Sequence, residues 1–166
     1  MLILGIDPGS RHTGFGLVRR RGARLEAVQF GRLSASPRAS LSARLGVLAA
    51  DLDELLDALR PGAVAIESAF LGMNPRSLMV LSQARGALLG VVGRRGIEVF
   101  EYSPAEVKNT VTGNGKAGKE QVARMVEMLL GLRGEGVAGD AADALAVAIC
   151  CAHRRPLETL MEAARE

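Results

Sequence analysis

The sequence predicts an α/β protein built on one mixed sheet, with helices on both faces of that sheet. Three observations indicate this class. Apolar runs at residues 2–7, 13–19 and 25–33 follow one another with only turns between them, as in a three-stranded antiparallel meander. Apolar residues then recur at helical spacing over 41–59, and helix and strand patterns alternate from there on. Residues 63–66 form a continuous apolar run, as buried parallel strands do. This order of elements predicts a mixed sheet with helices packed on its faces.

The later elements each carry a local signal. Pro61-Gly62 ends the first helix. Ser103-Pro104 begins another helix, because Ser caps a helix and Pro suits its first turn. The elements expected further along the chain are a helix over 75–92, a strand over 97–101, the helix from Ser103-Pro104, a Gly-rich mobile loop over 112–118, and helices over 119–130 and 141–153.

Length and composition indicate one folded domain. The chain has 166 residues, of which 48% are hydrophobic and 23% charged, which excludes an intrinsically disordered protein. No repeat, low-complexity tract or long linker divides it, so we expect a single domain over residues 1–166. Residues 154–166 are expected to form a short helix or a frayed C-terminal tail.

The sequence carries no sign of an oxidising compartment or of a membrane. Cys150 and Cys151 are adjacent, so a bridge between them would be strained, and we interpret them as small apolar residues of a helix. The N-terminus lacks the charged and apolar regions of a signal peptide. The most apolar longer window, 78–93, is interrupted by Arg85 and by glycines. We therefore expect a cytoplasmic protein.

Positive charge is concentrated in the first third of the chain. The net charge is +3, yet residues 1–50 hold eight Arg against two acidic residues, and Arg outnumbers Lys eighteen to three in the whole chain. Arginine binds phosphate through two parallel hydrogen bonds, so this bias fits a polyanionic partner. Genome composition and a solvated surface explain the bias equally simply, and the bias alone favours that explanation.

Four carboxylates are the candidate catalytic residues. Asp7 and Glu67 each end a predicted buried strand, which is where ligand sites of α/β sheets are found. Asp140 and Asp143 lie three residues apart at the start of an apolar helix, so they share one helical face. Each residue also has a simpler interpretation. Asp7 can begin a turn, and Glu67 can be an exposed strand end. Asp140 can cap the helix, and Asp143 can be an acidic residue of the first turn, which the helix dipole favours there.

The combination of these acids predicts a metal site. Converging carboxylates repel one another, and an acid on a buried helix needs a cation or a hydrogen-bond partner. Mg²⁺ and Mn²⁺ prefer oxygen ligands, whereas His12 and His153 are too few to suggest zinc. Two such ions can activate a water and stabilise the leaving oxygen in phosphodiester cleavage. The residues thus predict a Mg²⁺- or Mn²⁺-dependent phosphodiesterase.

Four segments together resemble a known family. GIDPGSRHTGFG, AIESAF, QARG at residues 83–86 and DAADALAVAI resemble the bacterial RuvC Holliday-junction resolvases, in order and spacing, along nearly the whole chain. The resemblance implies a ribonuclease-H-like fold and a homodimer. It also implies Mg²⁺- or Mn²⁺-dependent endonucleolytic resolution of four-way DNA junctions in homologous recombination and DNA repair, leaving 5′-phosphate and 3′-hydroxyl ends. The branch-migration complex of RuvA and RuvB is the partner that the family implies.

The resemblance also assigns roles to single residues. The family's four acids match Asp7, Glu67, Asp140 and Asp143, and its basic active-site residues match Lys108 and Lys119. An aromatic residue shortly after the catalytic Glu is matched by Phe70.

Further DNA contacts are expected from the residues themselves. Phe70 can wedge against a base at the crossover, or it can pack in the core. Lys119 follows the Gly-rich loop at a helix start and can reach a phosphate, although exposed Lys residues are usually only solvated. Arg76 at a helix start, Arg11, and Arg19 to Arg21 at the tip of the hairpin are candidate phosphate contacts that carry no sequence information.

Symmetry favours a homodimer, because the two cut strands of a junction are related by a near two-fold axis. The helix over 75–92 combines apolar residues with small ones and can pack against its own copy or within one subunit.

Two other functions share some of these features. An actin-like or sugar-kinase-like ATPase shares the opening DPGS and TG but usually has two such domains, and ATP hydrolysis would reveal it. A non-catalytic DNA-binding module has no need of the four acids, and junction binding without cleavage would reveal that.

Overall fold

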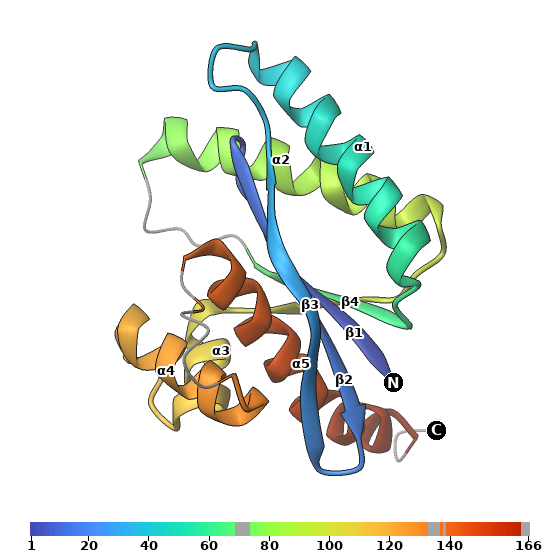
Figure 1. Ribbon diagram of the computed structural model, residues 1–166, viewed down its shortest axis with the longest axis vertical. Helices are drawn as coiled ribbons and strands as arrows, with labels where there is room; N and C mark the ends of the chain where they lie inside the picture. The colour runs from blue at the N-terminus through green and yellow to red at the C-terminus, as the bar shows by residue number, and fades with distance from the viewer. Residues whose placement is uncertain (69–73, 133–136, 138, 164–166) are drawn as a thin grey trace.

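The computed structural model of the protein describes residues 1–68, 74–132, 137 and 139–163 (Figure 1). The described elements are β1 (Leu2–Asp7), β2 (His12–Arg21), β3 (Arg24–Ser34), α1 (Leu41–Leu59), β4 (Ala63–Glu67), α2 (Pro75–Arg94), β5 (Val99–Tyr102), α3 (Pro104–Thr112), α4 (Lys119–Leu130) and α5 (Asp140–Ala163).

The strands form one mixed sheet in the order β3-β2-β1-β4-β5. β1 pairs antiparallel with β2, and β2 with β3. β1 pairs parallel with β4, and β4 with β5. The predicted fold class, three antiparallel strands followed by parallel ones, is therefore confirmed. Because β1 is the central strand and borders β4, the carboxyl ends of β1 and β4 lie next to each other.

Helices cover both faces of the sheet, as predicted. α1 and α2 lie on one side, and α3, α4 and α5 lie on the other (Figure 1). Alternate residues of β1 divide between two cores, with Leu4 and Ile6 packing in the cluster that includes Leu48 of α1, and Ile3 packing in the cluster that includes Leu145 of α5. Side chains alternate along a strand, so Asp7 lies on the same face as Ile3, the face that α5 covers.

The β2–β3 hairpin is longer than its sequence pattern predicted. The strands were expected to end at Arg19 and begin again at Leu25, with a polar tip between them. The structure instead pairs Arg20 with Leu25 and Arg21 with Arg24, and only Gly22 and Ala23 form the turn. Gly22 has a φ of 60°, which fits the first position of a two-residue hairpin turn. Cross-strand pairing keeps these arginines extended although their side chains are polar. β5, in contrast, begins two residues later than predicted, at Val99 rather than Ile97, because its pairing with β4 starts there.

The helix signals were mostly accurate. Ser103 and Glu106 form a reciprocal capping box at the start of α3, and α4 has the predicted bounds. α5 continues to Ala163, beyond the predicted end at residue 153. The first two residues of this extension, Arg154 and Arg155, contact α3 and β5. Arg154 pairs with Glu106 at 3.0 Å, and Arg155 lies 5.1 Å from the ring centre of Phe100.

Both cysteines are free and buried, as expected of small apolar helix residues. Within the described ranges, none of the helices combines the length and the apolar character needed to cross a membrane.

Candidate active site

Three glycines let α5 approach the sheet unusually closely. A Cβ atom on Gly5 of β1 would lie 1.9 Å from the carbonyl oxygen of Ala144, and one on Gly14 of β2 would lie 2.0 Å from that of Asp140. A Cβ on Gly16 would lie 2.7 Å from the Leu145 side chain. Real side chains do not tolerate these distances, so backbone packs directly on backbone here. The N-terminal turn of α5 is thereby held against the end of the sheet that bears Asp7.

Asp7 lies at the centre of this arrangement. It is the last residue of β1 and pairs in register with Gly14, the strand position against which Asp140 packs. Burial and, in decreasing order of effect, the charges of Asp143, Glu67 and Asp140 together raise the pKa of Asp7 to about 7. Lys119 acts in the opposite direction. The structure therefore brings the other three predicted carboxylates within electrostatic reach of Asp7.

Glu67 occupies the matching position on the neighbouring strand. Ile66 of β4 pairs with Ile6 of β1, so Glu67 ends β4 beside Asp7. Burial raises the pKa of Glu67, and the charge of Asp143 adds to that effect, whereas Lys108 and Lys119 lower it. Two strand ends and one helix thus contribute acids to one place, as the sequence predicted.

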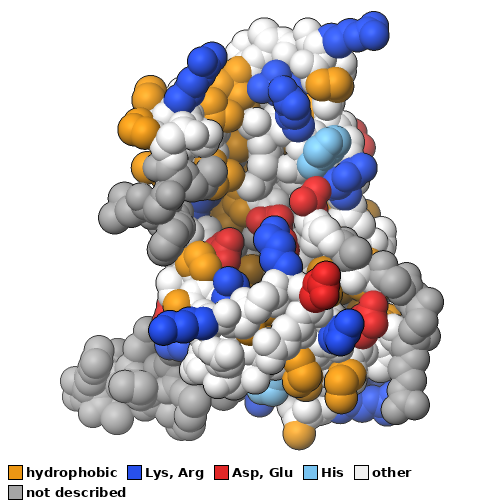
Figure 2. Space-filling model, turned by 90° about the vertical axis from the view of Figure 1, so that its left-hand side faces the viewer, with side chains coloured by type: hydrophobic (Ala, Val, Ile, Leu, Met, Phe, Trp, Pro, Cys, Tyr) orange, Lys and Arg blue, Asp and Glu red, His pale blue; other side chains and the backbone are white. Residues whose placement is uncertain are grey.

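A cavity of about 170 Å³ opens next to these acids. Its polar lining consists of Glu67, Asp143 and the two lysines that the resemblance singled out, Lys108 of α3 and Lys119 of α4. The Lys119 ammonium donates a hydrogen bond of 3.2 Å to Asp143, and the charge of Asp143 raises the pKa of Lys119. Lys119 is nevertheless 85% exposed, so its other protons remain free to meet a ligand. Figure 2 shows acidic and basic side chains gathered across the hollowed middle of this face.

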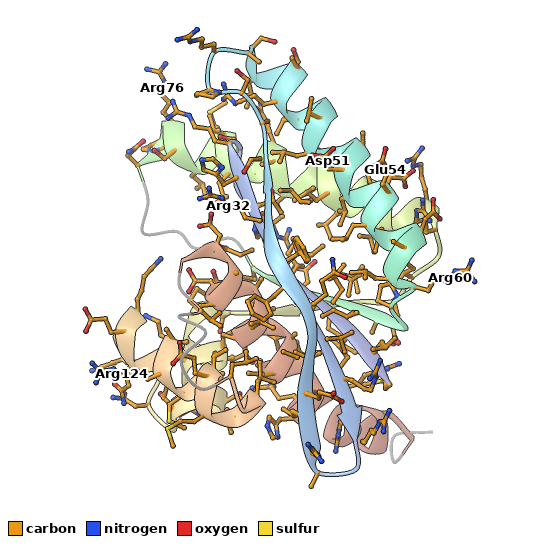
Figure 3. All side chains as sticks on the ribbon, in the orientation of Figure 1. Arg32, Asp51, Glu54, Arg60, Arg76 and Arg124 are labelled. Carbon is orange, nitrogen blue, oxygen red and sulfur yellow. The ribbon has the colours of Figure 1, made fainter. Side chains whose placement is uncertain are left out.

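Two arginines near the acids were not identified from the sequence. Arg85 of α2 donates a hydrogen bond of 3.2 Å to the backbone carbonyl of Glu67 and pairs with Glu101. It therefore fixes the backbone that carries Glu67. Arg32 of β3 lies 3.9 Å from Asp140, beside the start of α5 (Figure 3). Arg85 belongs to the QARG segment, which carried part of the family resemblance and could have singled this residue out. Arg32 is opposite Gly14 in the strand register, which no sequence pattern revealed.

The remaining predicted contacts fall in different places. Arg76 is exposed in the first turn of α2 and lines a cavity of about 360 Å³ together with Ser10, next to Arg11 in the chain (Figure 3). Arg19 to Arg21 lie at the far end of the hairpin, away from the acids. Phe70 lies outside the described residues.

The donor set determines which metal would suit the site. All four acids offer hard oxygen ligands, and gathering these partly buried negative charges is unfavourable without a cation. As the side chains lie, no group of three or more His, Cys, Asp or Glu within the described ranges is close enough to enclose a metal ion. The chemistry of the donors and their mutual repulsion fit a divalent cation, and the side chains would have to move closer together to bind one.

The family model and the similar curated proteins all point to one family. The sequence model of the family described as "Crossover junction endodeoxyribonuclease RuvC" matches residues 3–151. The RuvC protein of Anaeromyxobacter sp. (strain K) is 48% identical over 155 residues, which cover 93% of this chain and 82% of that one. The RuvC protein of Heliobacterium modesticaldum is 43% identical, over 92% of this chain and 94% of that one.

Solved structures agree. Thermus thermophilus RuvC superposes with a TM-score of 0.85 at 34% identity, covering 96% of this chain and 98% of that one. The same protein in complex with a Holliday junction substrate gives a TM-score of 0.88, with 96% and 97% covered. A yeast mitochondrial Holliday junction resolvase, at 12% identity and a TM-score of 0.64, shares the fold. The fold is thus the ribonuclease-H-like one that the resemblance implied, and the chain belongs to the RuvC family of crossover junction endodeoxyribonucleases.

Proposed function

We propose that this protein is a structure-selective endonuclease that resolves four-way DNA junctions by paired, symmetric hydrolysis of two phosphodiester bonds. The observation that carries the proposal is the cluster of Asp7, Glu67, Asp140 and Asp143 beside Lys108 and Lys119, in a chain of this family. The Thermus thermophilus relative whose structure includes a Holliday junction substrate supports the choice of DNA. Recombination and repair are the processes in which such junctions are resolved.

Each residue has a part in the proposed chemistry. Asp7 and Glu67 accept hydrogen bonds from a water and orient it toward the scissile phosphate. Lys119 and Lys108 line the same cavity as Glu67, and their positive charge there stabilises the phosphate as negative charge develops on it. Arg85 keeps Glu67 in position through its backbone carbonyl.

The four carboxylates would hold divalent cations, and we propose Mg²⁺, with Mn²⁺ as a substitute and two ions per site. Bound there, such ions lower the pKa of water and neutralise the departing 3′ oxygen. The resulting ends would be a 5′-phosphate and a 3′-hydroxyl. A direct test is to cut a synthetic junction and add DNA ligase. The nicked products should be sealed without prior end repair, and products that ligase cannot seal would refute these end groups.

The raised pKa of Asp7 leads to a prediction about stability. A carboxyl with a pKa of about 7 when folded and 3.8 when unfolded favours the folded state at low pH, and this contribution is lost as the pH rises through 7. Without metal, Asp7→Asn should therefore be more stable than wild type at pH 8, by about 1–4 kcal/mol in the free energy of unfolding, and should unfold at a higher temperature. The difference should shrink towards pH 4.

Thermal melting in EDTA measures this, and Asp51→Asn on α1 is a matched control. Adding Mn²⁺ at pH 8 should then stabilise the wild type much more than Asp7→Asn, because ligands of the folded state raise its stability. Equal metal responses of the two proteins would contradict a metal site at Asp7.

We further propose a homodimer that meets through α2. Ala84 and Leu88 of this helix are buried in the subunit core, but Met79 is 64% exposed. Gly86 and Gly90 are also exposed, and a Cβ on either would meet nothing within 4 Å. They lie four residues apart on one face, where small residues allow two helices to pack closely. A C₂ dimer would present two equivalent sites to the two strands of a junction.

The dimer proposal predicts that Gly86→Glu with Gly90→Glu weakens self-association by about 100-fold or more, because the interface would bury four like charges. The fold should persist, since both side chains would point into open space. Sedimentation equilibrium measures the dissociation constant. Gly46→Glu on α1, which is also exposed and unobstructed, is the control. An unchanged dimer in the double variant would exclude this face as the interface.

The same family relationship makes a RuvA–RuvB branch-migration complex the proposed partner and the cytoplasm the proposed location. The domain is proposed to span the whole chain, residues 1–166.

A further inference from the structure

Three arginines gather on one face of the β2–β3 hairpin turn. Arg21 pairs in register with Arg24, and Arg19 pairs with Glu26. Residues directly opposite each other in paired strands point to the same face, so these four side chains form one surface. They line a single cavity of about 180 Å³. We refer to Arg19, Arg21 and Arg24 as the hairpin-tip arginines.

The charge of this surface is not balanced by the protein. Arg19 lies 3.7 Å from Glu26. Arg21 and Arg24 are exposed, and neither forms an ion pair among the residues that the structure describes. Like charges opposite each other in a sheet are destabilising, so the Arg21–Arg24 pair is unfavourable unless an anion lies between the two side chains. The cavity leaves room for that anion.

The hairpin tip is held rigidly. Its turn has only two residues, Gly22 and Ala23. Arg20 points to the opposite face, where it donates hydrogen bonds to the backbone carbonyls of Gly22 and of Ala152 in α5. The arginines are therefore presented by a hairpin that is hydrogen-bonded to α5 at Ala152, and a ligand would lose little binding energy in ordering the backbone.

This surface is remote from the candidate active site. Asp7 pairs with Gly14, and Arg21 lies seven residues further along β2, which corresponds to roughly 23 Å at about 3.3 Å per residue. In Figure 1 the hairpin turn lies at the bottom, at the opposite end of β3 from the connection to α1. The hairpin-tip arginines therefore take no part in the proposed hydrolysis.

We propose that the hairpin-tip arginines bind backbone phosphates of a duplex arm of the DNA substrate, away from the crossover. Guanidinium groups bind phosphate oxygens through paired, charge-assisted hydrogen bonds. A DNA duplex carries closely spaced negative phosphates along both strands. Arginine contacts to these phosphates add affinity without distinguishing one base sequence from another. The proposal rests on the proposed function, in that DNA is the ligand.

The test compares two double variants that each remove two positive charges. Arg21→Gln with Arg24→Gln removes two charges from the hairpin tip. Arg60→Gln with Arg94→Gln removes two charges elsewhere, at the C-terminal end of α1 (Arg60, labelled in Figure 3) and in the last turn of α2. Junction and linear-duplex affinities are measured for both variants and wild type from 50 to 200 mM salt. Single-turnover cleavage of fully bound junction is measured alongside.

The hairpin variant should bind both DNAs about 10-fold more weakly at low salt, and its slope of log affinity against log salt should fall by about 1 to 2 relative to the control. Its cleavage rate at saturation should match wild type. Equal affinities and slopes in the two variants would overturn the proposal. If wild type binds duplex but never cuts a junction, the proposed function fails while the duplex comparison still decides the role of the hairpin.

Discussion

Replacing Asp7 by Asn should reduce junction cleavage by about three orders of magnitude or more, which is the size of effect expected when a group that stabilises the transition state is lost. Asp7 ends the central strand, its pKa is raised by burial and by three neighbouring acids, and Asn keeps its shape without its charge. Junction affinity should be retained or improved, because removing a negative charge from a DNA-binding face lowers repulsion. Single-turnover cleavage and gel-shift titration measure the two effects separately.

Asp51→Asn provides the matched control, since Asp51 is a partly exposed acid of α1 on the other side of the sheet (Figure 3). It should cut at the wild-type rate. If Asp7→Asn cut a four-way junction as fast as this control, the active site would have to lie elsewhere. Loss of binding together with cleavage would instead point to misfolding, and the melting experiment proposed above would reveal it.

Replacing Gly14 by Ala should destabilise the protein by about 3 kcal/mol or more, at the upper end of the usual cost of overpacking. A Cβ at this position would lie 2.0 Å from the Asp140 carbonyl oxygen, and backbone cannot move aside as a flexible side chain can. The start of α5 would have to shift away from β2, and Asp140 and Asp143 would shift with it. Cleavage should therefore fall even under conditions in which the variant is fully folded.

Gly46→Ala is the control for this substitution, because Gly46 is exposed on α1 and its Cβ would meet nothing within 4 Å. It should be neutral or stabilise the protein by up to about 1 kcal/mol, as Ala favours a helix over Gly. Chemical denaturation gives the free energy of unfolding of both variants. A Gly14→Ala protein as stable and as active as Gly46→Ala would show that close packing of α5 does not position the acids.

The sequence predicted the order and type of the elements well because buried faces impose periodicity. Leu, Ile and Val positions fixed β1, α1 and β4. The pattern failed at the hairpin, where Arg20 and Arg21 are extended because β3 pairs with them and not because they are apolar. It also ended the last long helix at residue 153 and left residues 154–166 as a short helix or a frayed tail, whereas Arg154 and Arg155 belong to α5. In the structure these arginines contact α3 and β5.

For the site, the strand ends and the i, i+3 pair on an apolar helix were enough to propose Asp7, Glu67, Asp140 and Asp143. Their proximity depends on features that no periodicity reveals. Gly5, Gly14 and Gly16 carry no chemistry of their own, yet they set how closely α5 approaches. Arg85 reaches Glu67 from the opposite helix layer, through a backbone carbonyl, and such a contact becomes visible only when α2 and β4 are in place.

The most direct test of the central claim is cleavage of an end-labelled four-way junction by the purified protein, with and without Mg²⁺ and beside a linear duplex of the same sequence. The carboxylate site predicts two nicks, placed symmetrically in opposing strands of the junction, only when the divalent cation is present, and little or no cutting of the duplex. Equal cutting of the junction in excess EDTA, or equal cutting of the linear duplex, would contradict a metal-dependent, junction-selective site built on Asp7.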